Sequence, residues 1–122
     1  MTDFQQMARD YLAAWNETDP EARRAAVRRV WTDDARYADP LADVTGHDQI
    51  DGLIAAAQGQ FPGFAFTQVG EVDGHHDQAR FTWGLGPAGA EPVVIGSDVV
   101  TLAEDGRISL VLGFLDQVPA AA

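Results

Sequence analysis

The sequence predicts an α+β fold in which three N-terminal helices pack on a curved, mainly antiparallel sheet. Apolar residues recur with the spacing of a helix through the first half of the chain, and from residue 64 onward the spacing changes to two, which is typical of strands. Only short turn-like segments separate those strands, as expected for antiparallel neighbours. Helices followed by strands along a chain are expected to cover one face of the sheet.

Residues 3–17 form the first predicted helix. Thr2, followed three residues later by Gln5, predicts a capping box at its start. The apolar side chains of this segment fall at helical intervals and form one continuous stripe, which consists of Phe4, Met7, Ala8, Tyr11, Leu12 and Trp15.

The second helix is predicted to begin with Asp19 as its N-cap and Pro20 as its first residue. It is expected to run to residue 30 or 31, before the pair Asp33-Asp34 breaks it. Residues 35–39 are predicted to be extended, because residues that precede a proline, here Pro40, avoid helical backbone angles.

The remaining elements follow from the same spacing rules. The segment from Pro40 to Gly46 is predicted to be a loop, and a third helix is expected to begin at His47 or Asp48. The apolar stripe of this helix consists of Ile50, Leu53, Ile54 and Ala57, and the residues that end it are Gly59, Pro62 and Gly63. Four strands are then predicted, at about 64–73, 78–86, 92–103 and 107–116. No linker or repeat divides the chain, so residues 1–122 are expected to form a single domain.

Composition excludes several classes of function. The net charge is −11, from 19 acidic and 8 basic residues, so we expect no nucleic-acid partner. The chain has no cysteine, which excludes disulfides, thiolate-bound zinc and cysteine nucleophiles. It also lacks a run of about 20 apolar residues, so no membrane segment is expected. These features predict a cytoplasmic protein.

Two clusters of charged or polar residues have alternative interpretations. Half of the eight basic residues fall within seven positions: Arg23, Arg24, Arg28 and Arg29. They form either an anion-binding patch or the solvated face of a helix in an acidic protein. His75 and His76 stand in a turn, where adjacent side chains point apart and no further His or Cys completes a ligand set, so no metal site is predicted. No glycine-rich phosphate loop is present, and no cofactor is expected.

Asp98 is the candidate functional residue to which the pattern itself points. It shares one face of the predicted strand with apolar or small residues, namely Val94, Gly96, Val100 and Leu102. A buried carboxyl group must find hydrogen bonds or hold its proton to a higher pH than usual, and such groups gather at functional sites. The alternative is a structural carboxylate that a neighbouring Arg or hydroxyl group satisfies.

Three further residues are candidates. Tyr11 lies in the middle of the apolar stripe, where it is either part of a site or plain core, and its hydroxyl group needs a partner when buried. Asp39 precedes Pro40 at the end of an extended segment, where it either faces a cavity or starts a turn. Asp116 ends the last strand, and it either points towards the same cavity or marks a fraying strand end.

Several segments resemble those of the nuclear transport factor 2-like superfamily, and in particular of SnoaL-like proteins. They are Trp31-Thr32-Asp33-Asp34-Ala35-Arg36-Tyr37-Ala38-Asp39-Pro40, Gly46-His47-Asp48-Gln49-Ile50, Ile95-Gly96-Ser97-Asp98-Val99-Val100, Glu104-Asp105-Gly106-Arg107-Ile108 and Gly113-Phe114-Leu115-Asp116. The resemblance covers nearly the whole chain and implies a cone-shaped fold that closes around a small apolar molecule. The superfamily contains enzymes, binders and partner proteins, so the fold by itself does not give the function.

Three segments are similar to those of ketosteroid isomerase within this superfamily. The catalytic tyrosine of that enzyme lies in a segment that matches Asp10-Tyr11-Leu12, and its general base in one that matches Tyr37-Ala38-Asp39-Pro40. The protonated aspartic acid of its oxyanion hole lies in a segment that matches Ser97-Asp98-Val99. The resemblance therefore implies Asp39 as base, with Tyr11 and Asp98 as hydrogen-bond donors to an enolate oxygen. Asp116 instead resembles the region where SnoaL-like polyketide cyclases carry an acid/base aspartate.

The first hypothesis is thus a cofactor-free enzyme, an isomerase or cyclase, that uses acid/base chemistry on a small apolar carbonyl compound. The wall of its pocket is expected to come from Trp15, Phe61, Phe66, Phe81, Trp83 and Phe114. The alternative is a non-catalytic module of the same fold that binds a ligand or dimerises. Both hypotheses are compatible with a homodimer. Val93, Ile95 and Val99 make the second face of their predicted strand apolar as well, and such a face is expected to be covered by a second copy of the chain.

Overall fold

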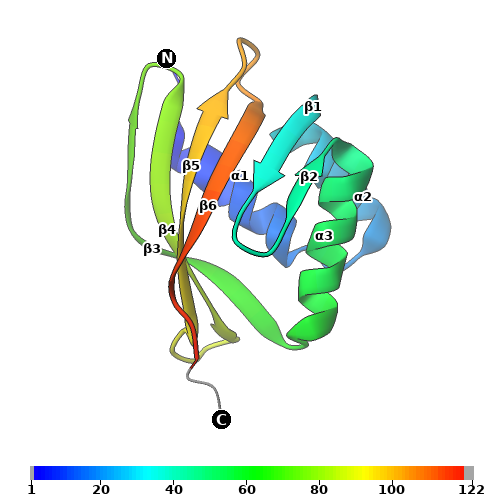
Figure 1. Cartoon of the computed structure of the whole chain (residues 1–122), viewed down its shortest axis with the longest axis vertical. Coiled ribbons are helices and arrows are strands. Elements are labelled where there is room, and N and C mark those ends of the chain that lie inside the picture. The colour runs from blue at the N-terminus through cyan, green and yellow to red at the C-terminus, as the bar shows by residue number, and fades with distance from the viewer. Residues whose placement is uncertain (1, 120–122) are drawn as a thin grey trace.

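The computed structural model describes residues 2–119, which form three helices and six strands (Figure 1). In chain order the elements are α1 (Phe4–Asn16), α2 (Pro20–Val30), β1 (Trp31–Ala38), β2 (Asp43–Thr45), α3 (His47–Gln60), β3 (Phe64–His75), β4 (Gln78–Pro87), β5 (Val94–Leu102) and β6 (Ile108–Gln117). The three helices and the four long strands predicted from residue spacing are all present. Within residues 2–119, no helix is long and apolar enough to cross a membrane.

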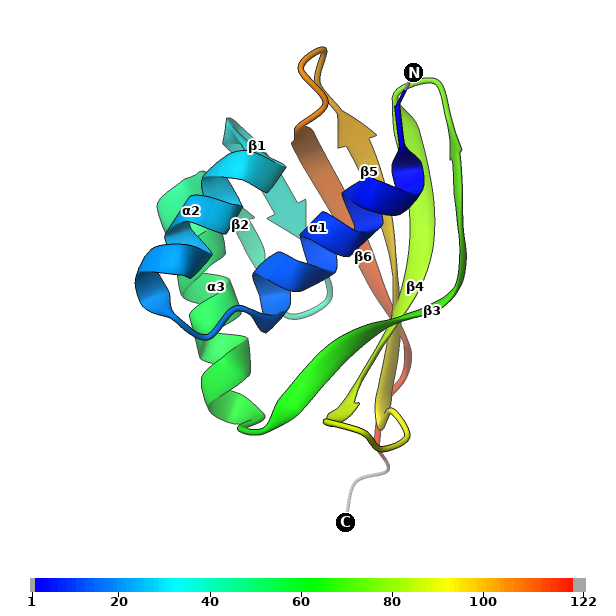
Figure 2. The same cartoon turned by 180° about the vertical axis from the view of Figure 1, so that it is seen from behind.

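The six strands form one sheet in the order β2-β1-β6-β5-β4-β3. The run from β3 to β6 is antiparallel, β1 pairs antiparallel with β2, and β1 runs parallel to β6. Helix α1 crosses one face of this sheet, and α2 and α3 lie next to β1 and β2 (Figure 2). The prediction of an α+β fold with helices on a mainly antiparallel sheet is therefore confirmed.

The starts of the first two helices are fixed by aspartate side chains. Asp19 caps α2 as predicted, because its carboxylate accepts the backbone N–H of Ala22 at 2.9 Å. Helix α1 is capped by Asp3, which accepts the backbone N–H of Gln6 at 3.0 Å. The predicted capping box that begins at Thr2 is wrong by one residue, since Asp3 offers the same kind of oxygen one position later.

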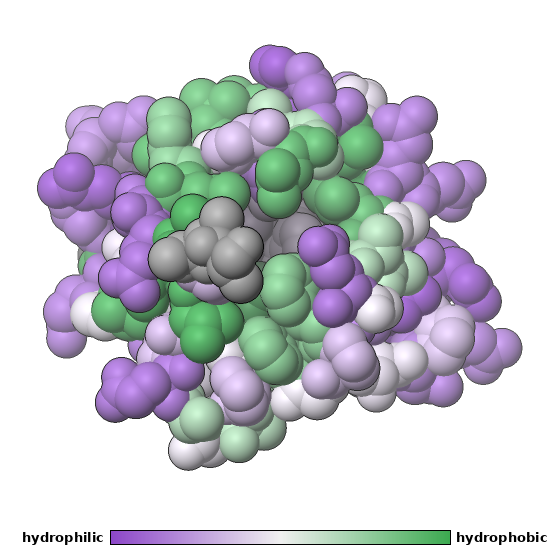
Figure 3. Space-filling view, turned by 60° about the horizontal axis from the view of Figure 1, so that its bottom comes forward, coloured by the Kyte–Doolittle hydropathy of each residue, from purple (hydrophilic) through white to green (hydrophobic). Residues whose placement is uncertain are grey.

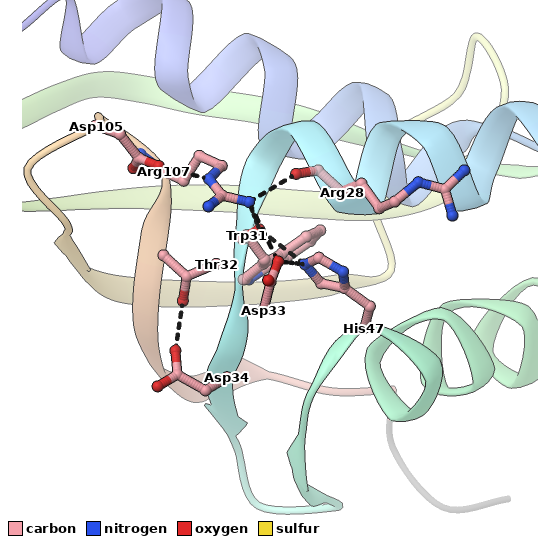
Figure 4. A network of polar contacts seen from close by, with 8 residues as sticks. All are labelled: Arg28, Trp31, Thr32, Asp33, Asp34, His47, Asp105 and Arg107. Atoms are coloured by element: carbon pink, nitrogen blue, oxygen red, sulfur yellow. Dashed lines mark hydrogen bonds and ion pairs between the residues drawn. The ribbon is translucent and has the colours of Figure 1, made fainter.

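Helix α2 passes directly into β1 at Trp31, four residues before the extended segment predicted from the sequence. Figure 4 shows why: side chains from distant elements bind the carbonyl groups that a helix end leaves without partners. The carbonyl oxygen of Trp31 accepts from Arg107 at 3.3 Å and from His47 at 2.9 Å, and Arg107 also reaches the carbonyl oxygen of Arg28 at 3.3 Å. The pair Asp33-Asp34 therefore lies inside β1 and does not end the helix.

Strand β2 lies in the segment that the sequence analysis predicted to be a loop. It has only three residues, too few to give a two-residue spacing that can be recognised. Its pairing with β1 is supported by Arg36, whose guanidinium group donates two hydrogen bonds to the carboxylate of Asp43, at 3.0 and 2.9 Å.

The arginine cluster of α2 is divided between the core and the surface. Arg24, Arg28 and Arg29 are exposed, as expected of a solvated helix face. Arg23 is only 7% exposed; it donates to Asp51 of α3 at 2.7 Å and to Gln58 at 3.2 Å. This buried ion pair ties α2 to α3, so Arg23 belongs neither to an anion patch nor to a solvated face.

Replacing Asp51 with Ala is expected to lower the free energy of unfolding by about 2–3 kcal/mol, because the buried Arg23 then keeps only a neutral partner. The matched control is Asp43→Ala, which breaks the exposed pair with Arg36 and is expected to lower the free energy of unfolding far less, because solvent screens that pair. Urea unfolding followed by tryptophan fluorescence measures both values. If both variants lost the same free energy of unfolding, burial would not explain the contribution of the Arg23–Asp51 pair.

Candidate functional site

A cavity of about 390 Å³ lies between the helices and the sheet. This volume falls within the range of about 300–1,000 Å³ that is typical of small-molecule sites. Its wall is largely apolar, and it includes six aromatic side chains from α1, β1, β3, β4 and the residue that follows α3: Tyr11, Trp15, Tyr37, Phe61, Phe66 and Trp83. Figure 3 looks onto the end of the molecule near the last residues of β6, where apolar residues surround a hollow and hydrophilic residues lie around them.

A hydrogen-bonded pair, Tyr11 and Asp98, lies in the wall of this cavity. Tyr11 faces inward because it stands in the apolar stripe of α1, and Asp98 because it shares the buried face of β5 with Val94 and Val100. The tyrosine hydroxyl group donates to Oδ2 of Asp98 at 2.6 Å, and only 1% of Asp98 is exposed. The other carboxyl oxygen, Oδ1, is buried and has no hydrogen-bond partner in the described chain. The pair therefore has one free polar atom.

Burial changes the acidity of both members of this pair. It raises the pKa of Asp98 to about 6, against the opposing effects of the Tyr11 hydrogen bond and a polar contact with Trp83. The negative charges of Asp39 and Asp116 raise it further. Burial, followed by the nearby charge of Asp98, also raises the pKa of Tyr11 well above its ordinary value. Asp98 can thus gain or lose a proton near neutral pH, whereas Tyr11 keeps its own.

A second tyrosine–aspartate pair, Tyr37 and Asp39, lies in the same cavity wall. The hydroxyl group of Tyr37 donates to Oδ2 of Asp39 at 2.6 Å. Oδ1 of Asp39 accepts the backbone N–H groups of Leu41 and Ala42, at 2.8 and 2.9 Å, which form the turn after β1. Three donors thus hold the Asp39 carboxylate in one orientation at the rim of the cavity.

Sequence reasoning missed Tyr37 as a member of the site, although this residue lies in one of the segments that resemble the nuclear transport factor 2-like superfamily. Residues two apart in a strand share a face, so the position of Tyr37 two residues before Asp39 was the available signal. Burial, followed by the charge of Asp98, raises the pKa of Tyr37 above the ordinary range of a tyrosine. Its hydroxyl group therefore remains a hydrogen-bond donor.

Gly113 makes room for the side chains of both Asp98 and Asp39. It pairs with Asp98 across β5 and β6, and its neighbour Leu112 pairs with Ala38 of β1. A Cβ atom at residue 113 would lie 2.8 Å from Oδ1 of Asp98 and 3.1 Å from Cβ of Asp39. The space above this glycine is therefore shared by both aspartates. The structure brings together Tyr11, Asp39 and Asp98, three of the four catalytic candidates, around one cavity.

Asp116, the fourth catalytic candidate, lies outside this cavity. It is exposed and accepts a hydrogen bond from the hydroxyl group of Ser97, which contacts Thr82 on the same outer face of the sheet. Alternation along β6 explains the placement, since Gly113 and Leu115 face inward and their neighbours outward. Of the two alternatives given for Asp116, the one in which it points towards the same cavity is therefore wrong.

Four of the six aromatic residues predicted for the pocket wall line the cavity: Trp15, Phe61, Phe66 and Trp83. The other two do not. Phe81 is buried behind Tyr11, with ring centroids 5.1 Å apart, and Phe114 is 57% exposed on the outer face of β6. Val99 on the outer face of β5 and Val93 just before that strand are each 37% exposed, and the homodimer expected to cover that face stays a prediction.

Comparison with known proteins identifies the family of this chain. A protein-family model, the SnoaL-like domain, matches residues 8–111. The chain belongs to the SnoaL-like family. The resemblance to the nuclear transport factor 2-like superfamily is thereby confirmed. A search of curated proteins finds no significant match to this SnoaL-like chain.

Solved structures provide further relatives of this SnoaL-like protein. A candidate isomerase of the SnoaL-like family from Agrobacterium tumefaciens strain C58 is 45% identical, with a TM-score of 0.88 over 92% of this chain and 96% of that one. A candidate SnoaL-like polyketide cyclase from Jannaschia sp. CCS1 is 20% identical, with a TM-score of 0.68 over 92% and 86%. A protein of ketosteroid isomerase-like fold from Catenulispora acidiphila, in complex with trimethylamine, is 21% identical, with a TM-score of 0.70 over 93% and 85%. The last two show the fold alone.

The raised pKa of Asp98 predicts how stability depends on pH. Between its ordinary value of 3.8 and about 6, the unfolded chain loses this proton before the folded one, so ionisation favours unfolding. The stabilisation that neutral Asp98 gives the folded state is complete below about pH 4 and is lost by about pH 7. The free energy of unfolding thereby falls by about 3 kcal/mol. The difference in unfolding free energy between wild type and Asp98→Asn, measured from pH 4 to 8, isolates this effect. A difference independent of pH would contradict it.

Gly113→Ala is expected to destabilise the protein by about 1–3 kcal/mol, because the added methyl group would overlap Asp98 and Asp39. Gly52→Ala is the control: this glycine lies inside α3 with nothing within 4 Å of an added Cβ atom, so the change is expected to stabilise by about 0.5–1 kcal/mol. Denaturant unfolding measures both. If Gly113→Ala were as well tolerated as Gly52→Ala, the close approach at Gly113 would be refuted.

Proposed function

We propose that this protein is a cofactor-free enzyme that moves a proton on a small apolar carbonyl compound bound in the cavity. The observation that carries the proposal is the buried Tyr11–Asp98 pair, which lies near Asp39 beside Gly113 in a largely apolar wall. Hydrogen-bond donors and a carboxylate base that line one small cavity are the groups that enolisation needs.

In the proposed reaction, Asp39 takes a proton from the carbon next to the substrate carbonyl group. The electron pair of that C–H bond moves towards the carbonyl oxygen and forms an enolate. Protonated Asp98 donates its carboxyl proton to the hydroxyl oxygen of Tyr11, which reverses the hydrogen bond between them and frees the Tyr11 hydroxyl proton to donate to the enolate oxygen. The apolar wall excludes water and strengthens these hydrogen bonds as negative charge develops.

The enolate has two outcomes that the same residues can serve. In an isomerase, Asp39 returns the proton to a different carbon, which moves a double bond. In a cyclase, the enolate carbon attacks a second carbonyl group of the same molecule; the ring bond forms, the C=O π bond opens to an alkoxide, and the proton held by Asp39 neutralises that oxygen. The relatives named as candidate isomerase and candidate polyketide cyclase make these two reaction classes the first to test.

A second function, ligand binding without catalysis, is favoured by the hydrogen bonding of Asp39. Both of its carboxyl oxygens already accept hydrogen bonds, from Tyr37 on one side and the turn backbone on the other. A carboxylate held in this way is well oriented, but accepting a proton would weaken at least one of these bonds. In a binding module, the same contacts would only shape the cavity.

Binding of 2-naphthol, a mimic of an enolate, is expected to separate these possibilities. Asp39→Asn resembles the protonated base and is expected to bind 2-naphthol about tenfold more tightly, because one negative charge leaves the cavity. Tyr11→Phe is expected to weaken binding about tenfold, through the loss of one hydrogen bond. Fluorescence titration of 2-naphthol at pH 6 and 7.5 measures these constants.

Asp116→Asn is the matched control, because Asp116 also acts on Asp98 through its charge but lies outside the cavity. The affinity of the Asp116→Asn variant for 2-naphthol is expected to differ from that of the wild type by less than about threefold. If Asp116→Asn tightened binding as much as Asp39→Asn, or Tyr11→Phe had no effect, the proposed oxyanion site would be wrong.

Exchange of the α-protons of cyclohexanone in D2O, followed by NMR, separates an enzyme from a binder. An enzyme is expected to accelerate this exchange, and Asp39→Asn is expected to abolish the acceleration.

A further inference from the structure

We propose that the cavity binds organic cations of the alkylated ammonium class, with the ammonium group held between Asp98, Asp39 and the aromatic wall. This inference goes beyond the proposed reaction, because it concerns binding alone and the ionised state of Asp98. It rests on the charges of the cavity wall, on an oxygen atom without a partner, and on the arrangement of four aromatic rings.

The charges that line the cavity are of one sign. Asp39 and Asp98 are the only charged side chains in its wall within residues 2–119, and no Arg or His side chain lines it. The chain has no lysine at all. An anionic ligand would meet two carboxyl groups with no compensating cation, so carboxylates and phosphates fit poorly. A cationic ligand supplies the charge that the wall lacks.

Oδ1 of Asp98 is the atom that most needs such a ligand. It is buried, it has no hydrogen-bond partner in the described chain, and it lies above Gly113 at the side of the cavity shared with Asp39. A buried carboxylate with an oxygen that has no partner is costly, and a positive charge in the adjoining cavity lowers that cost by electrostatic attraction. The side chain is thus preorganised to accept a cation.

Four aromatic rings form a continuous wall beside these carboxyl groups. The centroids of Tyr37 and Trp15 are 5.6 Å apart, those of Trp15 and Phe66 5.3 Å, and those of Phe66 and Trp83 5.5 Å. Aromatic rings attract cations that lie within about 6 Å of their centroids, and Trp is the most effective. A wall of adjoining rings with a carboxylate at its side matches a quaternary ammonium group.

The composition of the wall also selects alkylated over primary ammonium groups. A primary ammonium group carries three N–H donors that each need an acceptor after leaving water. Two of the Asp39 lone pairs already serve the turn backbone and a third serves Tyr37, and the remaining wall is mostly aliphatic or aromatic. Methyl groups on the nitrogen remove the unsatisfied donors and contact this apolar surface.

The pH dependence of cation binding should follow Asp98. The titratable groups around it are Tyr11 from α1, Tyr37 and Asp39 from β1, and Asp116 on the far side of β6; the lining residues of α3 carry no charge. Both tyrosines stay neutral, because their pKa values are raised. The cation is therefore held best above the pKa of about 6, when Asp98 is ionised, and less well below it.

The test compares benzyltrimethylammonium with neopentylbenzene, its neutral analogue of the same shape, in which carbon replaces nitrogen. The cation is expected to bind at least about tenfold more tightly at pH 7.5, and this preference is expected to decrease severalfold at pH 5. Quenching of the fluorescence of Trp15 and Trp83, which line the cavity, measures both affinities. Phenylacetate, an anion of similar size, is expected to bind more weakly than either compound.

Asp98→Asn is expected to reduce the preference for the cation and to remove its pH dependence, whereas Asp116→Asn, with its charge outside the cavity, is expected to keep both. Equal affinities for cation and analogue, or a preference unchanged in Asp98→Asn, would overturn the inference; the second result would indicate binding to the acidic surface. The 2-naphthol experiment fails or succeeds separately, because it depends on Tyr11 and on neutral Asp98, and a neutral Asp98 weakens cation binding.

Discussion

The central constraint in this structure is the burial of one carboxyl group, that of Asp98, in an otherwise apolar layer between helices and sheet. A single hydrogen bond from Tyr11 satisfies one of its oxygens, and the other is buried beside Gly113 without a hydrogen-bond partner in the described chain. The surrounding rings exclude water from the carboxyl group and raise its pKa. Stability, acidity and ligand preference at this site all depend on that one placement.

The elements that the sequence predicted well are those whose own residues carry the signal. Helices α1, α2 and α3 and strands β3 to β6 are long enough for their spacing to be read, and Asp98 could be placed on a buried face from its neighbours in β5 alone. The start of β1 could not be found, because it depends on Arg107 and His47, which reach Trp31 from distant parts of the chain. Strand β2 was too short to show a pattern.

The errors within the site have a related physical origin. In β6 both faces are apolar, so alternation alone did not show whether Phe114 and Asp116 or their neighbours face the helices. In the structure, Gly113 and Leu115 face the helices, because the absence of a side chain at Gly113 makes room for Asp98 and Asp39. Tyr37 was overlooked because an isolated buried tyrosine resembles core. Only its 2.6 Å hydrogen bond to Asp39 distinguishes it. Contacts between elements, which no single segment encodes, decided each of these cases.

The parallel pairing of β1 with β6 has a consequence for how the protein becomes functional during synthesis. Asp39 follows β1, whereas Gly113 belongs to β6, and the chain between them builds the rest of the sheet. A nascent chain that has not yet delivered β6 has Asp39 and Tyr11 but lacks the strand that brings Asp39 beside Asp98. Closing so long a loop is slow compared with forming the hairpins. The cavity is thus completed only when the last strand joins the sheet.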